Sequence, residues 1–477
     1  MPNNPKALPQ KLKNALLKTE TSWSSQPSPD HEKKINFLGK LSPQIRVMTG
    51  LENLYTNPLP ELKGKRLGLL ANPASVTSDF IHASDIIEAI YPGQLKVLFS
   101  PQHGFHAEKQ DNMIESDHCI DSKHQIPIFS LYSDTRVPKR EMFDRIDILL
   151  IDLQDVGTRV YTFIYTISYC IEAAGKYNKK VIILDRPNPV SGKIIEGNIL
   201  KKNLISFVGR FPIPMRHGFT VGEIASFFNH LPNAFEFFSS TFDPADNTFE
   251  GSSNGSKSHN DKDGVDFRSD LKPTCDLDII PMKGWKRDML FTDTGLPWIA
   301  PSPNLPTPAS ALVYPGQVIW EGTNISEGRG TTQPFELFGA PFIETEKLIE
   351  AVQPFIKGAI LRPVAFEPTS GKWQKNVCRG FQIHVTSPEE YKAYFTSLLI
   401  LQQIIRLYPD DFKWKQPPYE YEYNKLPIDL ILGDTELRRK IEQTANDNMK
   451  GIDSIERSWK TELDNFHTIS RNFYLYA

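Results

Sequence analysis

The segment from Asp147 to Pro189 constrains the fold more than any other part of the sequence. It begins with an apolar run at 147–155 and ends with a second one at 180–189. Between the two runs, apolar residues recur at helical spacing from Phe163 to Ala174. Both runs are continuous rather than alternating, which is typical of strands in a parallel sheet covered on both faces. The segment therefore predicts a strand, a helix and a second strand of an α/β fold.

Similar strand and helix patterns precede this segment. Short apolar runs at 64–72, 95–100 and 126–132 predict further strands, with helices at 80–90 and 139–143. This alternation is typical of a Rossmann-like, doubly wound and mostly parallel sheet with right-handed connections. Beyond it, Thr220 and Glu223 match a capping box for a helix that runs to Asn229. We therefore expect the fold class to be α/β.

The rest of the chain divides by composition. Residues 1–44 are polar and rich in Lys, Ser and Pro, which predicts a mobile tail. Residues 45–310 would form the Rossmann-like domain, with a polar excursion at about 244–278. Residues 311–477 mix helical patterns with strands such as 380–385 and predict an α+β domain that completes a cleft.

The charge, the cysteine content and the lengths of the apolar runs exclude several classes of protein. A net charge of −3 over 477 residues does not indicate a nucleic-acid partner. The four cysteines lie far apart without CxxC spacing, so we expect neither a zinc site nor a disulfide framework. No run reaches the ~18 apolar residues of a membrane span. The N-terminus lacks the apolar core of a secretory signal, so we expect a cytoplasmic protein, or a periplasmic or secreted one if the native start lies elsewhere. The oligomeric state is not specified.

Polar residues follow both apolar runs of the central segment. Asp152, Asp155 and Arg159 follow the first run, and Asp185 and Arg186 follow the second. Ligands of open α/β sheets bind outside the carboxyl ends of the strands. We therefore expect the functional site at this edge of the sheet.

The motifs that the chain lacks narrow the chemistry. No Walker A or HExxH pattern occurs and no GxGxxG follows a strand, so we expect no nucleotide cofactor and no metal. Two carboxyl groups are sufficient to hydrolyse a glycosidic bond, provided that one of them is held protonated. For any single carboxylate, a helix cap or a surface salt bridge is the alternative interpretation. The candidates in polar, glycine-broken loops are Glu108, Glu115, Asp152, Asp155, Glu321 and Glu327.

Over residues 45–477 the chain resembles the exo-β-N-acetylmuramidases, a family of NamZ-like glycoside hydrolases. The resemblance is specific because many long motifs occur in one order. They are PQHGF at 101–105, QDNMIE at 110–115, DLQDVG at 152–157 with Arg159 and Tyr161, LDRPNP at 184–189, PIPMRHG at 212–218, PSPN at 301–304 and EGTNISEGRG at 321–330. Many relatives carry Glu where this chain has Gln102, so position 102 supplies no essential acid here.

The resemblance implies a hydrolase that releases N-acetylmuramic acid (MurNAc) from the non-reducing end of peptidoglycan fragments such as MurNAc-GlcNAc, without a cofactor. In this interpretation Glu115 is the general acid, and Asp155 or Glu327 is the second carboxylate or positions it. The lactyl carboxylate of the sugar would explain the many arginines, although four are more than one carboxylate needs. The expected substrate-binding residues are Asn72, Gln102, His103, Arg159, Tyr161, Arg186, Arg216, His217, Glu321, Asn324 and Arg329.

Two other classes of function fit the same residues. One is a muropeptide- or sugar-binding protein on the same fold that does not turn its ligand over. The other is a deacetylase or amidase, which normally needs a metal or an activated nucleophile, and the sequence shows neither. The sequence does not indicate whether hydrolysis would retain or invert the anomeric configuration.

Overall fold

The structure, a computed structural model, describes residues 46–109, 113–133, 135–241, 271–445 and 450–477. Residues Arg46–Ala477 form one unit by their internal contacts. The predicted mobile tail and most of the polar excursion lie outside the described residues. No helix in the described part of the chain has both the length and the apolar character needed to cross a membrane.

The first part of the chain forms a seven-stranded sheet with the order β3-β4-β2-β1-β5-β6-β7. All neighbouring strands are parallel except β3 and β4, which are antiparallel. The predicted α/β class with a mostly parallel sheet is therefore confirmed. The strands are β1 (Leu67–Ala71), β2 (Leu95–Ser100), β3 (Cys119–Ile120), β4 (Pro127–Ser130), β5 (Ile148–Asp152), β6 (Lys180–Leu184) and β7 (Leu277–Ile280).

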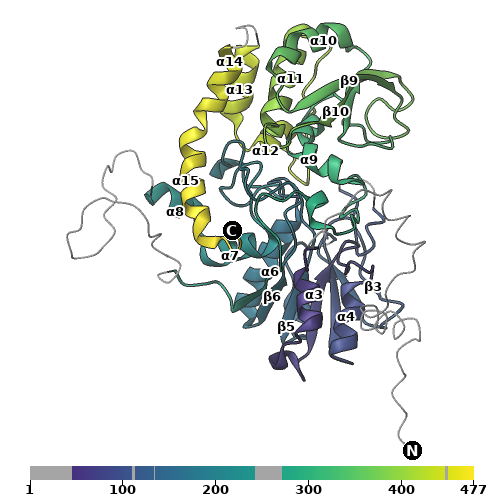
Figure 1. Cartoon of the computed structure of the whole chain (residues 1–477), viewed down its shortest axis with the longest axis vertical. Coiled ribbons are helices and arrows are strands. Elements are labelled where there is room, and N and C mark those ends of the chain that lie inside the picture. Colours follow the sequence, from purple (N-terminus) through teal and green to yellow (C-terminus); the bar gives the residue numbers. More distant parts are fainter. Residues whose placement is uncertain (1–45, 110–112, 134, 242–270, 446–449) are drawn as a thin grey trace, which may run out of the picture. The chain divides into compact units, whose positions relative to one another are not determined.

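Helices cover both faces of this sheet (Figure 1). Leu149 and Ile151 of β5 belong to the hydrophobic cluster that contains the apolar residues of α6. Ile148 and Leu150 belong to a second cluster, with apolar residues of α3 and α4. Successive side chains of one strand therefore enter opposite cores, which explains why the apolar runs in the sequence are continuous. The helices of this part are α3 (Gly50–Thr56), α4 (Ala83–Ile90), α5 (Arg140–Phe143), α6 (Phe163–Tyr177), α7 (Val221–His230) and α8 (Ala234–Thr241).

The remaining residues build an antiparallel sheet of three strands with the order β8-β10-β9, together with helices. Its strands are β8 (Leu337–Ala340), β9 (Ala359–Phe366) and β10 (Cys378–Val385). The helices are α9 (Pro308–Gln317), α10 (Thr345–Val352), α11 (Ala393–Leu407), α12 (Pro427–Leu432), α13 (Thr435–Thr444), α14 (Lys450–Ser458) and α15 (Lys460–Ser470). Short 3-10 helices lie at η1 (Pro60–Leu62), η2 (Lys202–Leu204), η4 (Phe291–Thr294), η5 (Val318–Gly322), η6 (Gln353–Phe355) and η7 (Arg471–Phe473).

One buried arginine joins the α/β part of the chain to α12. Arg159 is completely buried, and its Nη1 donates to the carbonyl oxygens of Asn198 at 2.7 Å and Ile213 at 3.1 Å. Its Nη2 donates to the carbonyl oxygens of Ile431 at 3.1 Å and Leu432 at 2.7 Å. The last carbonyl groups of a helix have no partner within the helix and favour a nearby cation. Arg159, which lies in a loop after β5, therefore donates hydrogen bonds to the last carbonyl groups of α12.

We predict that Arg159→Lys lowers the stability of the fold. A lysine ammonium is a compact point charge and cannot reach four carbonyl groups in two directions. Each buried carbonyl left without a partner costs about 1–3 kcal/mol, so we expect a loss of roughly 2–5 kcal/mol. The measurement is the Tm by differential scanning calorimetry.

The control is Arg439→Lys, because Arg439 is an exposed residue that pairs with Glu436 on the surface of α13. Its Tm should stay close to that of the wild type, since exposed ion pairs contribute little. Equal Tm values for the two variants would contradict the view that the hydrogen bonds of Arg159 stabilise the fold.

Candidate active site

A narrow cavity with an empty volume of about 460 Å³ lies beyond the ends of strands β2 and β5. One wall consists of loops that follow these two strands, and the other comes from residues beyond 300. This is the edge of the sheet where the sequence predicts a site. The polar residues that line the cavity are Gln102, His103, Tyr161, Thr162, Ser302, Asn304, Tyr314, Glu321, Arg329, Tyr419 and Glu420.

Local contacts hold the two sheet loops together. The Thr162 hydroxyl donates to Gln102 Oε1 at 2.6 Å, which ties the loop after β5 to the loop after β2. Gly157 allows the loop after β5 to turn with a φ of 69°, and a Cβ at this position would lie 2.4 Å from Asn188 Oδ1. Glycine is required there because the backbone is left-handed and the neighbouring loop is in contact.

Two carboxyl groups line the cavity, and Glu420 is the one without an ion pair among the described residues. It is 4% exposed, and it accepts hydrogen bonds from the Tyr132 hydroxyl at 2.7 Å and from Gln102 Nε2 at 3.2 Å. Burial raises the pKa of Glu420, and the charge of Glu321 adds to this, while the two hydrogen bonds act in the opposite direction. Glu420 therefore keeps its proton to a higher pH than an ordinary glutamic acid.

Glu321 lines the same cavity in a different environment. Its Oε1 accepts from Arg329 Nη2 at 2.7 Å, and its Oε2 accepts from the Tyr419 hydroxyl at 2.7 Å. Arg329 also lies 3.3 Å from Glu327, which binds Lys372 Nζ at 2.7 Å. The cavity thus contains one ion-paired carboxylate and one carboxyl group with a raised pKa, the combination that separates acid from base roles in glycosidases.

A tight turn carries Glu420 into the cavity. Tyr419 and Glu422 exchange two backbone hydrogen bonds, at 3.0 and 2.9 Å. Glu420 and Tyr421 lie between them with φ values of 45° and 66°, a conformation that non-glycine residues rarely adopt. Two such residues in succession are held only when their surroundings determine the conformation, and strain of this kind is concentrated at functional sites.

The structure places the three carboxylates that were predicted to be catalytic around the cavity rather than in its lining. Glu115 is exposed, and its Oε1 accepts from the Tyr421 hydroxyl at 3.3 Å. Asp155 is buried, accepts from the Gly157 N–H at 2.7 Å, and lies 3.6 Å from His217 Nε2. Glu327 is buried and forms ion pairs with Arg329 and Lys372.

Some of the predicted substrate-binding residues line the cavity and others do not. Those that do are Gln102, His103, Tyr161, Glu321 and Arg329. Burial raises the pKa of the Tyr161 hydroxyl well above its usual value, so it faces the cavity as a neutral hydrogen-bonding group. Among the four predicted arginines, only Arg329 belongs to this lining.

The other arginines have partners inside the protein. Arg186 forms an ion pair with Asp152, with Nη2 at 2.8 Å from Oδ2. Arg216 is completely buried, donates to the carbonyl oxygen of Val190, and its pKa is lowered by burial to about 10. Arg186 and Arg216 are therefore part of the protein interior and do not belong to the cavity lining.

Two asparagines and one histidine also lie outside the lining. Asn72 Nδ2 donates to the carbonyl oxygen of Pro301 at 3.4 Å. Asn324 Nδ2 donates to the carbonyl oxygen of Asp411 at 2.8 Å. His217 is buried beside Asp155. The structure therefore assigns these side chains contacts that organise loops.

Sequence reasoning missed Glu420, although a local sequence pattern marks the segment that carries it. The available signal is the run Pro417-Pro-Tyr-Glu-Tyr-Glu-Tyr423, in which tyrosine and glutamate alternate directly after two prolines. Proline pairs indicate a turn, and buried tyrosines supply the hydroxyl groups that hold a carboxyl group. No predicted strand precedes this run, so the rule that places sites at strand ends did not select it.

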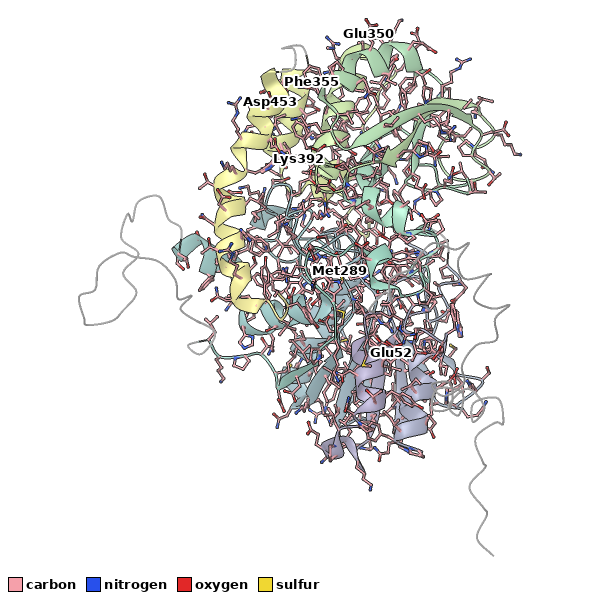
Figure 2. All side chains as sticks on the ribbon, in the orientation of Figure 1. Glu52, Met289, Glu350, Phe355, Lys392 and Asp453 are labelled. Atoms are coloured by element: carbon pink, nitrogen blue, oxygen red, sulfur yellow. The ribbon has the colours of Figure 1, made fainter. Side chains whose placement is uncertain are left out.

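A larger cavity in the C-terminal part has a different character. Its empty volume is about 820 Å³, and its lining includes Phe355, Lys392 and Asp453, which are labelled in Figure 2. All three side chains are exposed, and Lys392 pairs with Glu456 at 2.6 Å. Hydrated charges of this kind are typical of an ordinary surface, so the smaller cavity is the candidate active site.

In the described ranges, no group of three or more His, Cys, Asp and Glu residues is arranged to hold a metal ion.

Comparison with known proteins identifies the family. The family model described as "Exo-beta-N-acetylmuramidase NamZ, N-terminal" matches residues 67–309, and the corresponding C-terminal model matches residues 312–476. The peptidoglycan beta-N-acetylmuramidase NamZ of Bacillus subtilis (strain 168) is 37% identical over 462 residues, which are 97% of each chain.

Two crystal structures of DUF1343 family proteins from Bacteroides fragilis NCTC 9343 are also similar. One has a TM-score of 0.74 at 32% identity and covers 91% of this chain and all of its own. The other has a TM-score of 0.61 at 26% identity, with 90% of this chain and 99% of its own covered. On the family matches and the relative from Bacillus subtilis, the chain belongs to the NamZ exo-β-N-acetylmuramidase family.

Proposed function

We propose that this member of the family hydrolyses the β-glycosidic bond of the terminal MurNAc residue in fragments such as MurNAc-GlcNAc, and releases the free sugar. The observation that carries the proposal is the pair of carboxyl groups in one cavity, Glu321 in an ion pair and Glu420 with a raised pKa. Two carboxyl groups in unlike environments can perform this reaction with no other reactive group. The near full-length relative from Bacillus subtilis supports the same substrate class.

In this mechanism Glu420 donates a proton to the leaving oxygen as the bond to the anomeric carbon breaks. Glu321 is the second carboxylate, which acts as nucleophile in a retaining enzyme or as base toward water in an inverting one. Arg329 fixes the orientation of Glu321 through the 2.7 Å contact. Glu327 holds Arg329 from the other side, so it positions the second carboxylate without lining the cavity.

The acid role that the sequence assigns to Glu115 stays a prediction. Glu115 contacts Tyr421, the residue next to Glu420, so the two carboxyl groups belong to the same region of the structure. They differ in burial, because Glu115 is exposed and Glu420 is buried. Burial is the usual means of keeping a catalytic acid protonated, which favours Glu420.

The dependence of kcat on the leaving group distinguishes Glu420 from Glu115 as the candidate proton donor. A 4-nitrophenolate leaving group needs little protonation, whereas the sugar of MurNAc-GlcNAc needs a full proton. We predict that Glu420→Gln lowers kcat on the disaccharide by about 10²- to 10⁴-fold and on 4-nitrophenyl β-MurNAc far less. The matched variant Glu115→Gln should affect both substrates to a similar and smaller extent.

The opposite pattern, with the selective loss in Glu115→Gln, would transfer the acid role to Glu115 and contradict the assignment of Glu420. Equal losses on both substrates in Glu420→Gln would remove it as proton donor. A wild-type protein that binds MurNAc-GlcNAc without releasing MurNAc would contradict the proposed hydrolysis itself.

The pH profile gives a second test. The hydrogen bond from Tyr132 lowers the pKa of Glu420, so Tyr132→Phe should raise that pKa further. The acid form then persists to higher pH, and the descending limb of kcat against pH on MurNAc-GlcNAc should move to higher pH. Tyr408→Phe is the control, because the Tyr408 hydroxyl bonds to the backbone of Glu344. A descending limb that is unchanged or moves to lower pH in Tyr132→Phe would contradict the role of Glu420.

A further inference from the structure

The guanidinium group of Arg136 lies among three aromatic rings. Its Cζ is 3.9 Å from the ring centroid of Tyr421, 4.9 Å from that of Tyr132 and 5.3 Å from that of Phe207. A guanidinium stacked on aromatic faces is stabilised by the rings while its edge remains able to donate. The rings therefore hold a cation in a fixed orientation.

One edge of this guanidinium has no partner. Arg136 Nε and Nη2 are both buried and make no hydrogen bond to the part of the chain that the structure describes. Buried N–H groups without an acceptor are costly, and more so when they carry charge. Nε and Nη2 together form the edge that binds a carboxylate through two parallel hydrogen bonds.

Other arginines of this chain use the same edge for a carboxylate. Arg66 donates from Nε at 3.2 Å and from Nη2 at 2.6 Å to Asp147. Arg438 donates from Nε at 2.7 Å and from Nη2 at 3.4 Å to Asp429. Arg136 presents the equivalent pair of donors without a carboxylate from the protein.

The position of Arg136 relates this edge to the candidate active site. The Tyr132 ring that contacts Arg136 also donates its hydroxyl to Glu420 at 2.7 Å. Phe207, the third ring, precedes the cavity-lining residue Val208. The charge of Arg136 is among the groups that lower the pKa of Glu420. The guanidinium of Arg136 and the carboxyl group of Glu420 therefore both contact the side chain of Tyr132.

We propose that Arg136 binds the lactyl carboxylate of the terminal sugar and thereby makes the enzyme select MurNAc over N-acetylglucosamine (GlcNAc). This inference rests on the hydrolysis proposed above. The lactyl group is carried by the same sugar ring as the bond that is cleaved, which suits a cation close to Glu420. Among the arginines expected at first to have this role, Arg159 binds carbonyl groups and Arg186 binds Asp152. Arg216 donates from Nη2 to Val190, and Arg329 pairs through Nη2 and Nε with Glu321 and Glu327, so neither has an Nε–Nη2 edge without a partner.

Three 4-nitrophenyl glycosides test the proposal. They are β-MurNAc with the free lactyl acid, the same compound with the lactyl group as its carboxamide, and β-GlcNAc. We expect Arg136→Met to lower kcat/KM on the free acid by about 10- to 100-fold, and on the other two by less than about threefold, since only the first offers a carboxylate to the guanidinium. Arg136→Lys should recover part of the loss, because an ammonium supplies charge without the two-pronged geometry.

The matched control is Arg145→Met. Arg145 is exposed, its Cζ lies 5.8 Å from the ring centroid of Phe129, and it is not part of the cavity lining. This variant loses the same functional group from an aromatic contact and should keep the wild-type ratio between the three substrates. Tm values of both variants show whether a loss of fold contributes.

Equal losses on all three glycosides in Arg136→Met would mean a structural role and overturn the proposal, and so would unchanged kcat/KM values on all three. A loss that occurs only on a MurNAc glycoside carrying a stem peptide would assign the carboxylate to the peptide and overturn the lactyl assignment. If the wild type hydrolyses none of the substrates, the proposed function fails by itself. Calorimetric titration with MurNAc and GlcNAc then still tests Arg136, which should contribute to the binding of MurNAc alone.

Discussion

The burial of Glu420 beside the ion-paired Glu321 is the constraint on which the site depends. A carboxyl group in water would be charged at neutral pH, but Glu420 is buried and receives its hydrogen bonds from neutral donors, Tyr132 and Gln102. Glu321 in contrast is matched by the Arg329 guanidinium. One cavity thus contains a carboxyl group with a raised pKa and an ion-paired carboxylate, and this requires residues from both halves of the chain.

Much of the fold could be predicted because its strands are buried on two faces. The central segment forms β5 at Ile148–Asp152, α6 at Phe163–Tyr177 and β6 at Lys180–Leu184, close to the predicted pattern. The predicted capping box of Thr220 and Glu223 begins α7. Among the predicted residues that line the cavity, Gln102 follows a strand end, whereas Glu321 and Arg329 come from a motif that the family resemblance supplied. Glu420 contacts Gln102 across 318 residues of sequence, and no local pattern encodes such a contact.

The arginines show why residue type alone does not identify a ligand site. Arg159 satisfies backbone carbonyls, and Arg186 satisfies Asp152, so both are used to build the interior. Arg136 did not stand out in the sequence, because it follows a short strand in a loop without a motif. Its significance depends on which edge of the guanidinium lacks a partner, and only a structure with side chains provides that information.

The proposed mechanism depends most directly on the protonation state of Glu420. Infrared difference spectroscopy of the wild type against Glu420→Gln, across a pH titration, isolates the C=O stretch of this one carboxylic acid. We expect the band of the protonated acid to persist above the ordinary pKa of a glutamic acid, which is about 4.3. A band that disappears at or below that pH would show that Glu420 is ionised in the cavity, and would contradict its role as the proton donor.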